Sequence, residues 1–169
     1  MSTIDPRITK AFNRIQQILD TKILDEANHH PLQESALIET LIRLDEILLA
    51  ANEAGQRISF NDDLKLFPPK IKDITDTVHR CRHAVCHVRS SSQIADSKGL
   101  PKSQFSRVTP SDYYVEFNAA WNKGVLFDSA GLKLESDYDG DAAFFYGPHR
   151  LYLKRHIIRA FKEAKNALA

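Results

Sequence analysis

The chain has 169 residues, a formal net charge of +1, and 43% hydrophobic and 27% charged residues. This length and composition predict one globular domain, residues 1–169, with a buried core of its own. They exclude a membrane span, because no apolar run approaches about 20 residues, and they argue against a large positive surface for long duplex nucleic acid.

Three amphipathic helices are predicted in the first half of the chain, because apolar residues recur there at helical spacing. Their predicted ranges are residues 4 to about 24, 31 to about 54, and 68 to about 90. Asp5 and Pro6 supply an N-cap and a proline at the first position of the first helix. Gly55 is expected to end the second helix, and Pro68 with Pro69 to start the third.

The second half departs from the helical pattern until the last predicted helix, about His149 to Leu168. Residues 90–112 are predicted to be a mobile loop, because they are longer and more polar than an ordinary connection. Residues 113–147 contain β-like segments around a turn at 137–141, which predicts a small β-hairpin-like insert. The predicted fold class is therefore mainly α, a bundle of four to five helices with this insert before the last helix.

Residues 79–89, His-Arg-Cys-Arg-His-Ala-Val-Cys-His-Val-Arg, concentrate groups that transfer protons and hold phosphate. His79, His83 and His87 are spaced i, i+4 and i+8, so they form one ridge on a helix. Histidine suits proton transfer near neutral pH, and the planar guanidinium of arginine matches phosphate oxygens. The ordinary structural interpretation is a solvated ridge, with the arginines paired to three nearby carboxylates. Those carboxylates are Asp73, Asp76 and Glu46.

The stretch Arg82-His83-Ala84-Val85-Cys86-His87 resembles the R-x4–6-H motif of the HEPN superfamily, in which a polar residue often follows the arginine. The looser form of the motif also fits Arg80 with His87. The resemblance implies a HEPN-like bundle, a homodimer with a composite cleft, and cofactor-free, metal-independent RNA cleavage to a 2′,3′-cyclic phosphate and a 5′-hydroxyl. It assigns catalysis to Arg82, as phosphate clamp, and to His87, as acid and base. The expected substrate-binding residues are Arg80, His83, His79 and Arg89.

Dimerisation has a geometric reason as well. Residues five apart on a helix are separated by about 140° around its axis, so one copy cannot easily aim Arg82 and His87 at one phosphorus. A two-fold dimer brings a second copy of the helix to the same site. A toxin-like or phage-defence role, RNA as partner, and an antitoxin or another regulatory protein follow from the resemblance alone.

Cys81 and Cys86 are five apart on one predicted helix and are interpreted as reduced thiols in the core. Reduced thiols and the lack of a visible signal peptide favour a cytoplasmic protein. On the last helix, basic residues are spaced to form one positive face or an ordinary solvated surface. These are Lys154, Arg155, Arg159 and Lys162.

Two other functions compete with the nuclease. The first is a non-catalytic HEPN-like module that binds a nucleotide or a protein. The second is a helix-borne metal site at His79/His83 or His83/His87, but no Glu follows the first His and the interleaved arginines repel a dication, so no metal is expected. Aromatic residues of the insert are candidates for base stacking, although strand aromatics are more often core. They are Tyr113, Tyr114, Trp121, Phe144, Phe145 and Tyr146.

Overall fold

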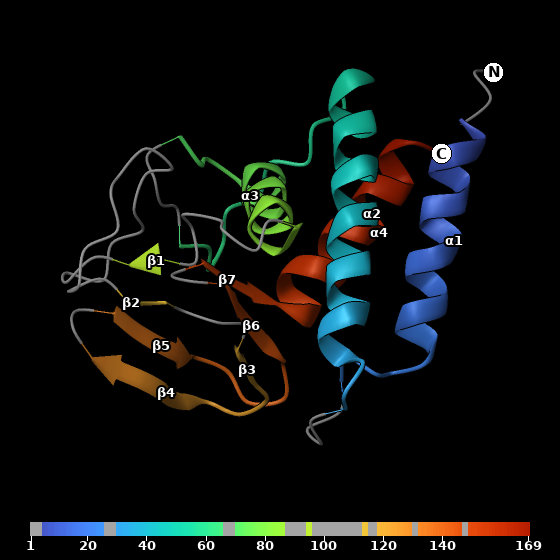
Figure 1. Ribbon diagram of the computed structural model, residues 1–169. Helices are drawn as coiled ribbons and strands as arrows, with labels where there is room; N and C mark the ends of the chain where they lie inside the picture. The colour runs from blue at the N-terminus through green and yellow to red at the C-terminus, as the bar shows by residue number, and fades with distance from the viewer. Residues whose placement is uncertain are drawn as a thin grey trace.

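The structure is a computed structural model that describes residues 5–25, 30–65, 70–86, 94–95, 113–114, 118–129, 132–146 and 149–169. This part of the chain contains four α-helices and three small antiparallel sheets, with the helices gathered on one side and the strands on the other (Figure 1). The chain is therefore mainly α with small antiparallel sheets. None of the helices in the described ranges has the length and apolar character needed to cross a membrane.

The first two helices lie side by side (Figure 1) and confirm two sequence predictions. In α1 (Pro6–Asp20), the Asp5 carboxylate accepts a hydrogen bond of 2.8 Å from the backbone N–H of Arg7, which makes Asp5 the N-cap. After α2 (Gln33–Glu53), Gly55 has φ +76°, a left-handed conformation that favours glycine just past a helix end.

The third helix, α3 (Ile74–Cys86), begins later than predicted. The carboxylate of Asp73 accepts a hydrogen bond of 3.0 Å from the backbone N–H of Asp76 and so caps the first turn. The prediction that the helix starts at Pro68 and Pro69 is wrong, because this cap fixes the start five residues further on. Cys81 lies in the core as predicted, but Cys86 is exposed, so the core prediction is wrong for Cys86.

The last predicted helix is also corrected. Residues 149–152 form a strand, β7 (His149–Tyr152), and the chain then enters a π-helix (Leu153–Ile158) and α4 (Arg159–Ala167). The carboxylate of Asp141 accepts hydrogen bonds from the backbone N–H groups of Lys154 at 2.7 Å and Arg155 at 3.1 Å. This cap starts the helical segment at Leu153, four residues after His149. Residues 149–152 pair with β6 instead. Such tertiary pairing overrides local helix propensity.

The strands confirm the β character predicted for residues 113–147. β3 (Asn118–Ala120), β6 (Ala143–Tyr146) and β7 form one sheet, in the order β3-β6-β7. β4 (Gly124–Ser129) and β5 (Leu132–Ser136) form a hairpin, and β1 (Ile94–Ala95) pairs with β2 (Tyr113–Tyr114). β1 lies within the predicted mobile loop, and the rest of residues 90–112 lies outside the described ranges.

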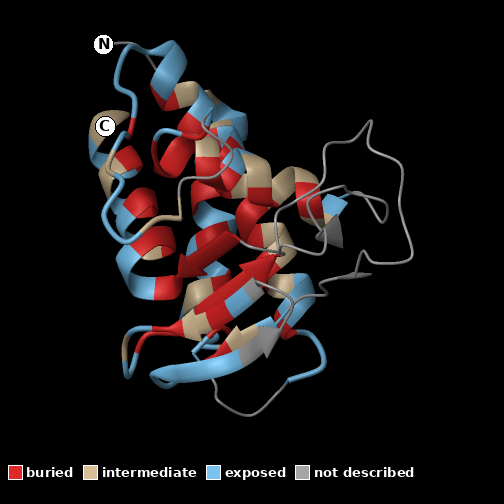
Figure 2. Ribbon diagram, turned by 90° about the vertical axis from the view of Figure 1, so that its left-hand side faces the viewer, coloured by how far each residue is buried: buried red, intermediate tan, exposed pale blue. Residues whose placement is uncertain are grey.

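Two strands of the three-stranded sheet, β6 and β7, are buried along their whole length (Figure 2). Phe144 and Tyr146 of β6 point into the main core, which is built from the inner faces of all four helices. Phe145 alternates to the opposite face and joins a second, smaller cluster with Leu134 and Tyr152. The sheet also packs against α3, which contacts β6 directly.

Candidate functional site

The packing of α3 against α2 brings a buried carboxylate to the histidine ridge. Asp45 interrupts the apolar stripe of α2, and only 6% of its side chain is exposed. Its Oδ1 and Oδ2 atoms lie 3.0 and 3.2 Å from Nδ1 of His79. A fixed carboxylate at Nδ1 favours the imidazole tautomer with its proton on that nitrogen, which leaves Nε2 unprotonated and able to accept a proton.

His79 is accessible to solvent although Asp45 contacts its Nδ1 atom. Its side chain is 47% exposed, and the His83 ring lies edge-on to it, with ring centroids 4.6 Å apart. The predicted i, i+4 ridge is therefore confirmed for these two histidines. Together they present imidazole nitrogens beside each other on one face of α3.

Arg82 belongs to the same group. Its Nε atom lies 3.8 Å from Oδ2 of Asp45, an ion pair beyond hydrogen-bond distance, and 35% of its side chain is exposed. We call Asp45, His79, Arg82 and His83 the α2–α3 cluster. It combines a proton acceptor, a second imidazole and a permanent cation around one buried carboxylate.

The carboxylates expected to pair with the arginines of α3 are taken by other residues. Arg57 donates to Asp73 at 2.8 Å and to Asp76 at 2.6 Å. Glu46 pairs with Arg43 at 3.2 Å. The expected pairing is therefore wrong for Arg82, whose carboxylate partner in the described residues is Asp45.

Arg80 makes no hydrogen bond or ion pair to the α2–α3 cluster among the described contacts. Its Nε atom is buried and has no hydrogen-bond partner, as is true of both ring nitrogens of His149 in β7. Burial lowers the pKa of His149 to about 4, and the positive charge of nearby Arg80 adds to this effect. That Arg80 lines the same groove as His79 therefore stays a prediction.

Two predicted site residues, His87 and Arg89, lie outside the described residues. The predicted catalytic combination of Arg82 with His87 is accordingly represented by Arg82 alone. Of the four predicted substrate-binding residues, His79 and His83 join Arg82, and Arg80 does not.

The predicted basic face of the last helix is occupied by internal contacts. Arg155 pairs with Asp63 at 3.4 Å, and Arg159 donates to Asp62 at 2.8 Å. Arg159 also donates to Glu163 at 2.8 Å, and these hydrogen bonds raise the pKa of its guanidinium. These ion pairs join the C-terminal helical segment to the loop before α3. They support the interpretation that the basic residues form an ordinary surface and not a binding face.

Aromatic side chains of the insert do not form a stacking surface in the described part. Phe144, Phe145 and Tyr146 are buried, and the partly buried Trp121 packs against the main core. The side chains of Tyr113 and Tyr114 lie outside the description.

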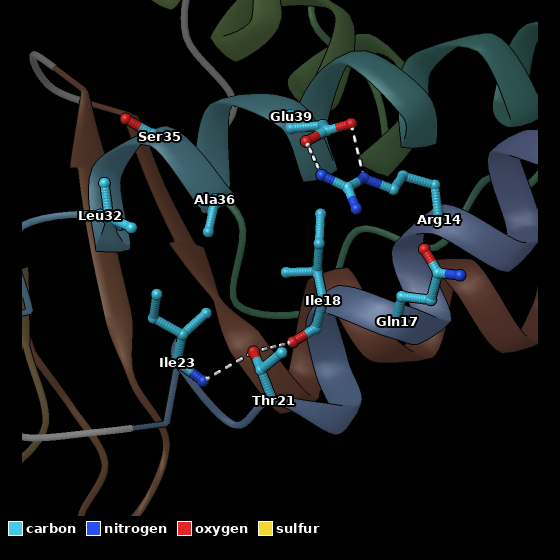
Figure 3. A pocket seen from close by; sticks show the side chains of 9 residues that line it. All are labelled: Arg14, Gln17, Ile18, Thr21, Ile23, Leu32, Ser35, Ala36 and Glu39. Carbon is cyan, nitrogen blue, oxygen red and sulfur yellow. Dashed lines mark hydrogen bonds and ion pairs between the residues drawn. The ribbon is translucent and has the colours of Figure 1, made fainter.

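A cavity of about 310 Å³ lies between α1 and the start of α2 (Figure 3). Arg14 and Glu39 pair across it through two hydrogen bonds of 2.8 Å, so their charges compensate each other. None of its lining residues belongs to α3. Among the side chains that the structure describes, no group of three or more His, Cys, Asp and Glu residues is placed to hold a metal ion.

Sequence reasoning missed Asp45 and His149. Asp45 carried a usable signal, because an acidic residue within an apolar helical stripe needs a partner in the interior. His149 carried none, since its burial results from strand pairing between segments that were predicted to be an insert and a helix.

No protein-family model, curated protein or solved structure matches this chain. The α2–α3 cluster and the sequence motif that begins at Arg82 are therefore the two features that point to a function.

Proposed function

We propose that the protein is a metal-independent endoribonuclease of HEPN type that cleaves RNA as a homodimer, with a composite site at the dimer interface. The observation that carries the proposal is the half-exposed His79, held at Nδ1 by buried Asp45 and flanked by Arg82 and His83. The R-x4-H motif from Arg82 to His87 adds to it.

The cluster suits the first half of the reaction. Nε2 of His79 is positioned to take the proton of a 2′-hydroxyl, because Asp45 holds the opposite ring nitrogen. The 2′-oxygen then attacks the adjacent phosphorus, and Arg82 stabilises the negative charge that develops on the phosphate oxygens. The 2′,3′-cyclic phosphate forms as the bond to the 5′-oxygen breaks.

The second half needs an acid that protonates the departing 5′-oxygen. By resemblance, this acid is His87, which also serves as a base in the family motif. Arg82 and His87 are about 140° apart around an ideal helix, so the proposal takes one of them from each copy of α3. Arg82, the first residue of the motif, lies on α3, the third of the described helices, and this position supports the proposed HEPN-like bundle of four to five helices.

The biological role in the proposal is that of a cytoplasmic toxin or phage-defence nuclease. Uncontrolled RNA cleavage harms the host, so an antitoxin or another inhibitory protein belongs to the same proposal. These elements rest on the resemblance, and the α2–α3 cluster supports only the chemistry.

A non-catalytic HEPN-like binding module is the second candidate, and one observation favours it. Asp45 already engages both His79 and Arg82, which is the arrangement expected of a helix–helix contact that stabilises the fold. In that case the two residues hold α2 and α3 together, and an RNA or protein partner binds without being cleaved.

The test is incubation of the purified protein with total cellular RNA, in parallel reactions with and without a chelator. Wild type is compared with His79→Ala, Arg82→Ala and His87→Ala, and the ends of the products are determined. Wild type is expected to produce fragments that end in a 2′,3′-cyclic phosphate. The cleavage rate is expected to fall by about 10²–10⁴-fold in each variant. Controls are His30→Ala and Arg43→Ala, which change the same residue types away from α3.

Folding is checked in parallel by thermal melting and by the dimer mass in solution. Loss of cleavage with the melting temperature and dimer retained supports the catalytic role. No cleavage by wild type, or equal cleavage by all variants, favours the binding module, and inhibition by the chelator favours a metal-dependent reaction.

A further inference from the structure

Near the packing of α3 against β6, three buried nitrogen atoms have no hydrogen-bond partner among the residues that the structure describes. His149 is 1% exposed, and neither Nδ1 nor Nε2 has a hydrogen-bond partner. The Nε atom of Arg80 is also buried and has no hydrogen-bond partner among the described residues. Buried polar groups in folded proteins are almost always hydrogen-bonded, so three such nitrogen atoms on two neighbouring side chains require an explanation.

The fold brings these two side chains together. His149 pairs with Tyr146 across the β6–β7 hairpin, and α3 packs against β6. Tyr146 and Cys81, the residue after Arg80, belong to the same core cluster. Arg80 therefore lies on α3 next to a residue of the core cluster that His149 borders, and its positive charge contributes to the lowered pKa of the His149 imidazole.

We propose that Arg80 and His149 form a binding site for an oxyanion of the phosphate class. Arg80 supplies planar donors and a positive charge that forms no ion pair with any residue the structure describes, and a neutral His149 supplies one N–H donor. The other buried histidine provides the contrast within this molecule: His156 has both ring nitrogens bonded, one to Tyr152 and one to Asp62. The fold therefore satisfies a buried imidazole where no ligand is required.

The charge of Arg80 decides the class of ligand. A guanidinium beside the imidazole repels a metal cation, whereas it strengthens each hydrogen bond to an anion. Arg80 is only partly buried, so the site has a contact with the surface, with His149 at its inner end. A tetrahedral phosphate group can accept from both side chains at once.

The inference is independent of the proposed nuclease, because Arg80 and His149 are not part of the α2–α3 cluster. The phosphate group has two possible sources, free phosphate and the backbone of a nucleic acid, and both present the same oxygens. The experiment therefore uses three ligands: inorganic phosphate, a nucleoside 5′-monophosphate, and a short RNA with 2′-O-methyl groups that prevent cleavage.

The first measurement is thermal melting against ligand concentration, with chloride at the same ionic strength as the reference. Wild type is expected to show a saturable rise in melting temperature. Arg80→Gln and His149→Phe are expected to bind at least about tenfold more weakly, whereas Arg43→Gln, which alters an exposed arginine, keeps the wild-type response. A response to RNA alone assigns the phosphate to a nucleic acid, and a response to all three ligands assigns it to a phosphate group as such.

A second measurement keeps the proposal testable if a variant does not fold. In wild type, the imidazole nitrogen signals of His149 are expected to shift on ligand addition, while those of His156 stay in place. Absence of any melting response in wild type, or a response that Arg80→Gln retains in full, overturns the proposal. Such a result means that His149 is a buried histidine satisfied by water or left unsatisfied.

Discussion

The Nε2 atom of His156 donates a 2.9 Å hydrogen bond to the backbone carbonyl of Asp62, a residue 94 positions earlier in the chain. This bond joins the loop before α3 to the π-helix. At Nδ1 the same ring accepts from the backbone N–H of Tyr152 at 3.0 Å, so both of its nitrogens are used in the neutral form. Protonation of His156 breaks the second bond, which makes this contact sensitive to acid.

The two buried histidines predict a loss of stability in acid. Burial is the main cause that lowers the pKa of His149 and of His156 from 6.5 to about 4. Below pH 6.5 the unfolded chain binds these protons and the folded chain does not, so the free energy of unfolding falls as the pH drops toward 4. Each histidine contributes on the order of 3 kcal/mol to this loss when it is complete.

Urea unfolding at pH 7.5, 6.5, 5.5 and 4.5 measures the effect. His149→Phe is expected to flatten the profile between pH 6.5 and 4, because one of the two groups is removed. His30→Ala, an exposed histidine, serves as the matched control and keeps the wild-type slope. A wild-type free energy that stays constant over this interval contradicts the prediction.

Asp45 is predicted to act through His79. In Asp45→Asn the side chain keeps its shape but loses the negative charge that faces Nδ1 of His79 and pairs with Arg82. If the protein cleaves RNA, the rate is expected to fall by about 10²-fold or more, as for other catalytic histidines without their carboxylate. The measurement is the cleavage rate across pH 5.5–8.5, with circular dichroism as a check of folding.

The matched control for Asp45→Asn is Glu46→Gln, which removes the neighbouring, exposed carboxylate of α2. It is expected to leave cleavage unchanged. Equal rates in wild type and Asp45→Asn show instead that Asp45 only joins the helices.

Arg57 is predicted to be a stabilising residue of the α3 N-terminus. It holds the buried carboxylate of Asp73 through two hydrogen bonds of 2.8 and 2.9 Å and reaches Asp76 as well. Arg57→Gln leaves the Asp73 charge without its partner and is expected to cost about 2 kcal/mol in the free energy of unfolding. Arg43→Gln breaks an exposed pair and is expected to cost less than about 1 kcal/mol. Denaturant unfolding measures the free energy of unfolding of both variants. Equal losses in Arg57→Gln and Arg43→Gln contradict the prediction.

The two thiols are predicted to differ in reactivity. Burial raises the pKa of Cys81 to about 12, so it has almost no thiolate at neutral pH, whereas Cys86 is exposed. A thiol-reactive disulfide dye should titrate one cysteine in the native protein and two in urea. In Cys86→Ser, the native protein should release almost no dye, and rapid release there means that Cys81 is accessible.

Local signals in the sequence determined the first helices well. Asp5 with Pro6 and the residue pattern ending at Gly55 specify helix ends through contacts with their own neighbours. The start of the third helix was missed because two capping signals, Pro68–Pro69 and Asp73, lie close together. Only the Asp73 carboxylate, held by Arg57, caps the first turn of α3.

The ridge of His79 and His83 also follows from the sequence, because i, i+4 spacing on a helix depends only on helical geometry. The sequence does not show which residues of other elements lie next to this ridge. Asp45 reaches His79 because α2 packs on α3, and the charge of Arg80 acts on His149 because α3 packs against β6, the strand that pairs with β7.

The sequence by itself thus determined which segments are helical or β-like in most of the chain, and where imidazoles and guanidinium groups concentrate. Only the tertiary structure decided that residues 149–152 form a strand and that Asp45 orients His79. It also decided that Nε of Arg80 and both ring nitrogens of His149 have no hydrogen-bond partner among the described residues. The physical reason is range: caps and helical spacing act between neighbours in sequence, whereas strand pairing and burial of charge depend on residues brought together by the fold.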